Sequence, residues 1–107
     1  MENLKKHIPI LEYLKSLNTK EQKQLIKNAN VGLLRVFSEI CINLIKRNIE
    51  LSPVDIKRLR KYEHLIEKLS QRKHSAKVRK NILQKGGFLS SILSLLPTLI
   101  GGILSLT

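Results

Sequence analysis

The chain has 107 residues, room for one small domain, and carries 20 lysine and arginine residues against 8 acidic ones. Its net charge of +12 and isoelectric point near 10.2 are typical of proteins that bind a polyanion, either nucleic acid or an anionic membrane surface. The alternative is a basic protein whose charge serves only its solubility.

The scarcity of aromatic and cysteine residues excludes several kinds of site. Two tyrosines, two phenylalanines and no tryptophan leave little with which to stack unpaired bases, so we expect contacts with the phosphate backbone and little reading of base sequence. Cys41 is the single cysteine, which excludes an internal disulfide and a multi-cysteine zinc site. It lies in an apolar helical run and is expected to be a small buried side chain. The N-terminus does not resemble a secretory signal, and we expect a reducing compartment.

Charge divides the sequence into zones. Residues 1–45 contain seven basic and four acidic residues, residues 46–85 contain thirteen and four, and residues 86–107 contain none of either sign. We therefore expect N-terminal helices over 1–30, a basic helical core unit over 31–85, a Gly-Gly junction at 86–87 and a charge-free apolar tail over 88–107.

The periodicity predicts an all-α fold, because apolar residues recur at spacings of three and four and no run alternates as a strand would. We expect a small bundle of three to five short helices followed by an apolar C-terminal helix. The first helix covers about residues 3–17, although Pro9 can move its start to about residue 8. Thr19 and Gln22 form a capping-box pattern that opens a second helix over about 20–28, which is followed by a turn at 28–32.

The next three predicted helices carry the core and the charge. A helix over about 32–48 has the most continuous apolar face and is expected at the centre of the folded unit. Ser52 and Pro53 open a helix over about 53–70, with Ser52 as its cap and Pro53 at its first position. Ser75 caps a further helix to about residue 85, and Gly86-Gly87 ends it.

Basic side chains follow one face of the predicted helix over 53–70. Lys57, Lys61, His64, Lys68 and Arg72 succeed one another at steps of four, three, four and four. Cations at about one per helical turn can follow a phosphate backbone, with an affinity that falls steeply with salt. The alternatives are a solvated helix face or binding to anionic lipid. The predicted phosphate-binding residues are Lys57, Arg58, Arg60, Lys61, Lys68, Arg72, Lys73, Lys77, Arg79 and Lys80.

The segment over 88–107 has no charge and is long enough to cross a hydrocarbon core as a helix. Ser90, Ser94, Thr98 and Gly102 form a stripe of small residues, while Pro97 and Gly101-Gly102 favour a kink. The segment can insert into or disrupt a membrane, serve as a stable anchor, or pack against protein. Its membrane-contacting or packing side consists of Phe88, Leu89, Ile92, Leu96, Leu99, Ile103 and Leu106.

No motif for catalysis or for cofactor binding is present. The sequence contains no glycine-rich phosphate loop and no nucleophile motif, and His7, His64 and His74 are spread over different segments. We therefore expect no catalytic residue, no metal site, no cofactor and no enzymatic activity.

The order of several short motifs resembles a known family. Leu33-Leu34-Arg35 and Leu59-Arg60-Lys61-Tyr62 precede a Gly86-Gly87-Phe88-Leu89 junction and a tail rich in leucine and isoleucine. Residues 48–52 read Asn-Ile-Glu-Leu-Ser, and residues 83–85 read Leu-Gln-Lys. This order resembles small basic proteins of adintoviruses and Polinton-like elements, which are similar in layout to adenovirus core protein X. The resemblance covers about three quarters of the chain, and its most specific parts are the Gly-Gly-Phe junction and the Leu-Ser-Pro turn.

The resemblance implies a DNA-condensing protein of a virion core. Adenovirus precursors of this type are cut by the viral protease after a glycine-containing site, which makes Gly86 and Gly87 a possible processing site. Gln84 departs from the leucine, isoleucine or methionine expected at the fourth residue upstream, and Leu99-Ile100-Gly101-Gly102 fits better. Such a protein would lie in the virion and in the host nucleus.

The sequence therefore predicts a protein that binds double-stranded DNA non-specifically through the phosphate backbone. Its tail would contact membrane lipid or a capsid protein, and a homo-oligomer is a further possibility. One alternative is a tail-inserted or membrane-disrupting protein of an intracellular membrane, whose basic region binds anionic lipid. Another is a helical module for protein interaction or oligomerisation, in which the tail completes a hydrophobic core.

Overall fold

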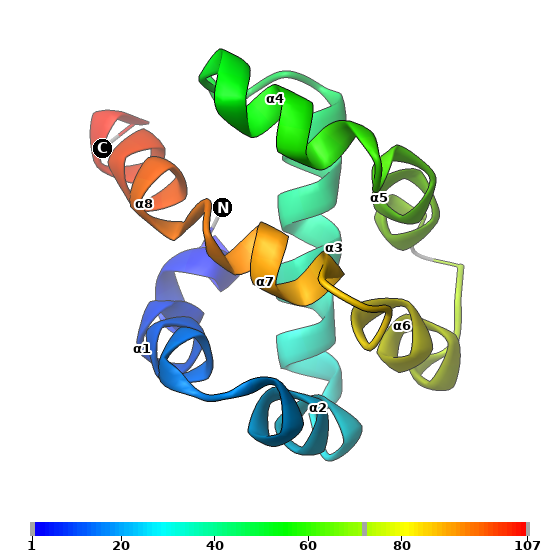
Figure 1. Ribbon diagram of the computed structural model, residues 1–107. Coiled ribbons are helices and arrows are strands. Elements are labelled where there is room, and N and C mark those ends of the chain that lie inside the picture. Colours follow the sequence, from blue (N-terminus) through cyan, green and yellow to red (C-terminus); the bar gives the residue numbers. More distant parts are fainter. Residues whose placement is uncertain (1, 72, 107) are drawn as a thin grey trace.

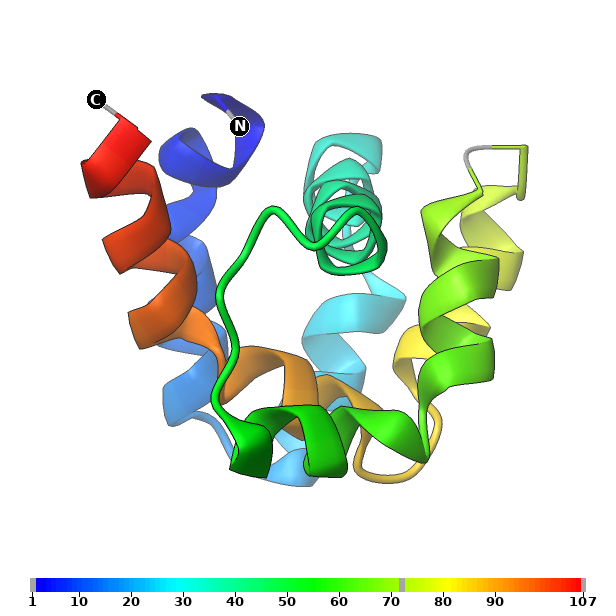
Figure 2. The same cartoon turned by 90° about the horizontal axis from the view of Figure 1, so that it is seen from above.

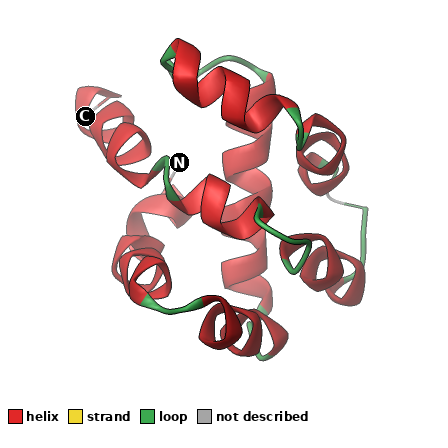
Figure 3. Cartoon of the chain, viewed as in Figure 1, coloured by secondary structure: helices red, strands yellow, loops and turns green. Residues whose placement is uncertain are grey.

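The computed structural model describes residues 2–71 and 73–106, and the side chains of residues 3–71 and 73–102. The all-α prediction is confirmed, since these residues form eight helices and no strand (Figure 3). The helices are α1 (Glu2–Ser16), α2 (Thr19–Lys27), α3 (Val31–Ile45), α4 (Pro53–Arg60), α5 (Glu63–Ser70), α6 (Ala76–Leu83), α7 (Phe88–Leu93) and α8 (Leu96–Leu106).

Helix α3 is the centre of the fold, as its apolar face predicts. The other helices are arranged around it, and α1 lies beside α7 and α8 (Figures 1 and 2). Helix α3 packs most extensively against α5, then against α1 and α6. Leu34, Phe37 and Ile40 on α3 are at most 1% exposed, and they join side chains from all seven other helices in one apolar core. The N-terminal helices therefore pack on the rest of the chain.

Helix α1 continues through Pro9, so the alternative start near residue 8 is wrong. Proline removes one helical hydrogen bond, but Pro9 and Lys5 are exposed, and water can bond the freed carbonyl of Lys5. Leu4 lies in the first turn with 0% exposure, so the residues before Pro9 are held by the core.

The cap of α2 lies one residue before the predicted one. Asn18 is the N-cap: its Oδ1 accepts from the Glu21 backbone N–H at 2.8 Å, and its own N–H donates to Glu21 Oε1 at 3.2 Å. Thr19 is the first helical residue instead of the cap. Gln22 faces inward, 7% exposed, and its Nε2 donates to the Leu14 carbonyl at 3.1 Å. Burial of Gln22 sets this register and leaves Glu21 to complete the capping box.

Helix α3 ends at Ile45, three residues before the predicted end, where Arg47 takes a positive φ of 56°. The predicted caps Ser52 and Ser75 are confirmed, because each hydroxyl accepts from the backbone N–H three residues later. Helix α6 ends at Leu83 with Gln84 as its C-cap, slightly before the predicted end near residue 85, so Gly86-Gly87 does not end it. The two glycines lie in the turn that follows, and Gly87 is the N-cap of α7, in the left-handed region at φ 79°.

The predicted helix over 53–70 is wrong in one respect, since the chain turns at Lys61-Tyr62 and forms two helices, α4 and α5. The two helices point in different directions (Figure 2). The turn allows α4 to pack on α7 while α5 packs on α3. Tyr62, 9% exposed, lies inside the turn, with its ring centroid 5.5 Å from that of Phe88.

The apolar segment from Phe88 onward forms two helices and contributes to the core. Its predicted contact residues Phe88, Leu89, Ile92, Leu96 and Leu99 are all at most 5% exposed. Ile103 and Leu106 belong to α8, but their side chains lie outside the described residues. The break between α7 and α8 falls just before Pro97, because proline is tolerated in the first turn of a helix. Across the described part of the chain, no helix combines the length and apolar character needed to cross a membrane.

Candidate nucleic-acid interface

Helices α2 and α6 lie side by side, and this contact brings together lysines that are distant in the sequence (Figure 1). Lys80 of α6 donates from Nζ to the backbone carbonyl of Lys27, the last residue of α2, at 2.8 Å. A cation at the carboxyl end of a helix is favourable, because the last carbonyls are unpaired and the helix dipole is negative there. The Lys80 ammonium thus stabilises the contact between two basic helices.

We call the exposed basic side chains of this region the α2–α6 basic surface. Residues 68–85 contain seven basic residues and no acidic one, and the neighbouring helix α2 contains three lysines and one glutamate, Glu21. The lysines of α2 follow helical spacing along one exposed side of the helix, while Gln22 and Ile26 face the core. The members of the surface are Lys20, Lys23, Lys27, Lys73 and Lys77, all exposed, and the half-buried Lys80.

The prediction from sequence missed the three lysines of α2. Their spacing of three and four residues was a visible signal of one charged helix face. The decisive observation is the packing of α2 against α6 across some fifty residues of chain, which no local pattern indicates.

Arg79 does not belong to the exposed surface, contrary to the prediction. It is 8% exposed and lines a small polar cavity of about 250 Å³ together with Asn3, Arg35, Ser38 and Glu39. Residues three and four later, Ile82 and Leu83, are buried against the core. Helical periodicity therefore places Arg79 on the inward side of α6.

The predicted continuous basic face over 57–72 is wrong, because the turn at Lys61-Tyr62 separates it into two parts. Lys57, Arg58, Arg60 and Lys61 are exposed on α4, or directly after it, and Lys68 is exposed on α5. Arg72 lies outside the described residues. Helix α4 lies at the top of the molecule and α6 lies lower right in Figure 1, so the predicted residues form separate groups.

Two cations of the α4 group already have partners within the chain. Arg58 Nη1 donates to Ser94 Oγ at 2.9 Å, which ties α4 to the residue that ends α7. Lys61 Nζ lies 5.1 Å from the centroid of the Tyr62 ring, within the range of a cation–π contact. Both side chains remain exposed, so they can also contact phosphate, but their intramolecular contacts restrain them.

The remaining predicted features lie elsewhere. Gly86 and Gly87 are exposed in the turn between α6 and α7. In the small-residue stripe, Ser90 lies on α7, while Thr98 and Gly102 lie on α8. The described residues contain no group of three or more histidine, cysteine or acidic side chains arranged to hold a metal ion. Cys41 is buried in α3, as predicted, and burial raises the pKa of its thiol from 9.0 to about 12.

The arrangement is suited to binding a polyanion. Exposed lysines present mobile point charges and three donors each, which can bind phosphate oxygens without requiring a defined base sequence. Comparison with known proteins found no matching family model, no matching curated protein and no matching solved structure.

Proposed function

We propose that the protein binds double-stranded DNA non-specifically through the phosphate backbone and has no enzymatic activity. The observation that carries the proposal is the α2–α6 basic surface, where two helices joined by the Lys80–Lys27 contact display lysines with a single glutamate among them. Its mechanism is the release of counterions as lysines replace them along the duplex. The exposed cations of α4 add a second group of contacts at another part of the molecule.

The proposal includes a structural role for the apolar C-terminal segment. Burial of Phe88, Ile92 and Leu99 supports packing of this segment in the protein's own core, in preference to insertion into a membrane. The resemblance in motif order supports a role in condensing DNA, as a protein of virion-core type. Two separate basic groups on one small protein would allow it to bridge neighbouring duplexes.

The experiment measures the binding of a labelled duplex of arbitrary sequence by fluorescence anisotropy over a series of salt concentrations. The test variant carries Lys20→Gln, Lys23→Gln and Lys27→Gln. Its matched control carries Lys5→Gln, Lys6→Gln and Lys15→Gln on α1, which also removes three exposed lysines. Because both variants have the same net charge, a difference between them reports the position of the lysines.

Each phosphate that a lysine no longer neutralises makes the slope of log K against log salt shallower by about 0.9. The slope of the α2 variant should therefore be shallower by up to about three such steps. The α1 control should bind more tightly than the α2 variant and keep most of its slope. Equal effects in the two variants would contradict a defined interface, and binding that does not depend on salt would contradict the proposed function. Leakage of anionic liposomes by the intact protein would instead favour membrane activity of the C-terminal segment.

A further inference from the structure

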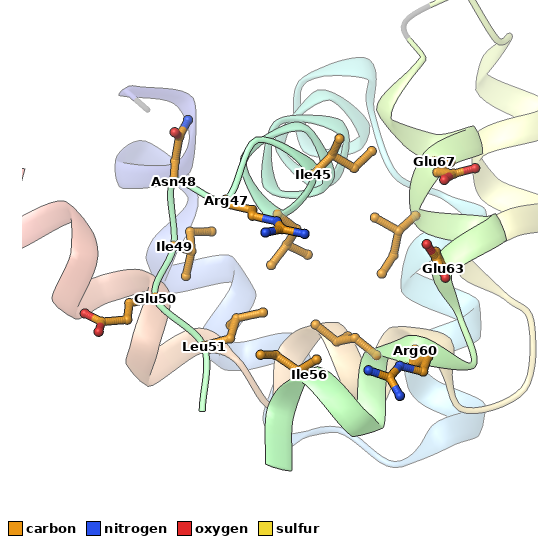
Figure 4. Close-up of a pocket in the computed structure, with 13 residues that line it drawn as sticks. Ile45, Arg47, Asn48, Ile49, Glu50, Leu51, Ile56, Arg60, Glu63 and Glu67 are labelled. Atoms are coloured by element: carbon orange, nitrogen blue, oxygen red, sulfur yellow. The ribbon is translucent and has the colours of Figure 1, made fainter. Parts of the chain in front are cut away.

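A groove lies on the part of the molecule between the end of α3, the loop over 46–52, α4 and α5 (Figure 4). Its volume is about 890 Å³, enough to receive several side chains. It exists because α4 packs on α7 while α5 packs on α3, and the loop that joins α3 to α4 leaves a space between them. No described residue of the apolar C-terminal segment lines this groove. Of the predicted phosphate-binding residues that the structure describes, Arg60 alone lines it.

The groove is apolar inside and partly open to solvent. Leu44, Ile49, Leu59 and Ile66 are among its lining residues. Ile45 and Ile56 also line it, with 47% and 46% of their surfaces exposed. Two exposed aliphatic side chains thus face one groove, one from α3 and one from α4, and a concave site with an apolar lining is the usual form of a binding site.

The charged residues around the groove differ from those of the rest of the protein. Glu50, Glu63 and Glu67 line it together with Arg47 and Arg60, a net charge of −1 on a chain whose net charge is +12. Three of the eight acidic residues of the sequence therefore gather at this one groove.

Glu63 and Glu67 are one helical turn apart on α5, on the same wall of the groove (Figure 4). Both are exposed, and neither carboxylate has an ion-pair or hydrogen-bond partner among the described side chains. Two like charges at this spacing repel each other within the helix, and a cation placed between them would relieve that repulsion. The groove thus combines an apolar interior with unpaired negative charge on one side.

We propose that this groove binds an amphipathic α-helix of a partner protein, with the helix's apolar side in the groove and its flanking lysine or arginine side chains against Glu63 and Glu67. A helix that places apolar residues at positions i, i+3, i+4 and i+7 is the usual occupant of an open apolar groove of this kind. The carboxylates of Glu63 and Glu67 on the α5 wall repel a polyanion such as DNA and favour a basic helix over an acidic one. The groove shares one residue, Arg60 of α4, with the proposed DNA contacts, and the α2–α6 basic surface lies on other helices.

The test measures binding of two fluorescent synthetic peptides to the full chain by anisotropy, without DNA. The peptides are of about 16 residues, share one leucine face with the spacing given above, and carry either lysine or glutamate at the flanking positions. At physiological ionic strength the field of the whole protein is screened beyond about 8 Å, so a preference for the lysine peptide reports the local carboxylates. We expect the lysine peptide to bind about tenfold more tightly than the glutamate peptide.

Two variants locate the site. Ile56→Asp should weaken binding of the lysine peptide about tenfold or more, because it places a charge on the apolar contact surface. Val54→Asp is the matched control: Val54 lies on the same helix with 65% exposure but does not line the groove, and binding should be unchanged. Both residues are largely exposed, so both variants should fold, which circular dichroism checks.

The variant Glu63→Lys with Glu67→Lys tests the role of charge and should reverse the preference between the two peptides. Absence of binding by the lysine peptide, equal binding of both peptides, or equal effects of Ile56→Asp and Val54→Asp would each overturn the proposal. Sedimentation of the protein alone gives a further check. If Ile56→Asp converts a dimer into a monomer, the occupant is a second copy of this chain, and the proposal of a separate basic helix is wrong.

Discussion

The rings of Tyr62 and Phe88 pack against each other at a centroid distance of 5.5 Å and an angle of 48°, and this pair joins the turn between α4 and α5 to the start of α7. The Tyr62 hydroxyl also approaches the Gly86 carbonyl, as donor, at 3.4 Å. One aromatic pair thus links the middle of the chain to its apolar C-terminal segment. Aromatic pairs contribute about 0.5–1.5 kcal/mol beyond the apolar area that they bury.

Gly87 should be the glycine least tolerant of substitution in this junction. Its φ of 79° disfavours any residue with a Cβ, and a Cβ at this position would lie 2.5 Å from the Tyr62 hydroxyl oxygen. We expect Gly87→Ala to lower the free energy of unfolding by about 1–3 kcal/mol, measured by urea denaturation. Gly86→Ala is the control, because nothing lies within 4 Å of its Cβ, and it should change stability little.

The background Tyr62→Phe separates the two causes. Without the hydroxyl, the added methyl group no longer meets the oxygen, and only the backbone strain remains. The destabilisation caused by Gly87→Ala should therefore be smaller in Tyr62→Phe than in the natural chain. An equal destabilisation in both backgrounds would show that the hydroxyl contact does not contribute.

The start of α2 offers a test of the cap position. Asn18→Ala should cost about 1 kcal/mol of unfolding free energy, because it removes the oxygen that accepts from the Glu21 N–H. Thr19→Ala should change stability by no more than about 0.5 kcal/mol, since Thr19 is the first helical residue and is exposed. Stability is measured by thermal or urea unfolding. A larger loss of stability in Thr19→Ala than in Asn18→Ala would show that Thr19 is the cap.

Truncation after residue 87 should abolish cooperative unfolding of the remainder. It removes buried side chains that include Phe88, Ile92 and Leu99, and removing each large apolar side chain from a core costs about 2–5 kcal/mol. Several such costs together exceed the stability of about 5–15 kcal/mol that small proteins have. Loss of a sharp thermal transition by circular dichroism, with binding of a hydrophobic dye, is the expected result. A sharp transition retained by the truncated protein would contradict packing of this segment in the core.

Cys41 should make stability depend on pH in the alkaline range. The thiol of the unfolded chain loses its proton near its ordinary pKa of 9.0, while the folded thiol keeps it to about 12. Its contribution to stability is therefore complete below about pH 9 and is lost as the pH rises toward 12. The free energy of unfolding should fall less steeply above pH 9 in Cys41→Ala than in the natural chain. A thiol reagent should modify Cys41 only after denaturation, and rapid modification of the folded protein would contradict its burial.

The local features of this fold are readable from the sequence because they depend on neighbouring residues. The spacing of apolar residues predicts the all-α class and the central position of α3, and the caps Ser52 and Ser75 lie next to the helices that they begin. The turn at Gly86-Gly87 that leads into α7 is local as well, since Gly87 has a backbone conformation that glycine adopts without strain.

The features that only the tertiary structure decided depend on distant residues. Lys61-Tyr62 contains neither glycine nor proline, and the apolar spacing continues across it, so no local signal indicates the turn between α4 and α5. At this turn Tyr62 packs on Phe88, which is distant in the sequence. The burial of the C-terminal segment follows from the apolar surfaces that α1, α4 and α7 offer one another. The α2–α6 basic surface exists because α2 packs against α6, where Lys80 donates to the carbonyl of Lys27. Net charge and its distribution along the chain were determined by sequence, but which cations form one surface was decided by helix packing.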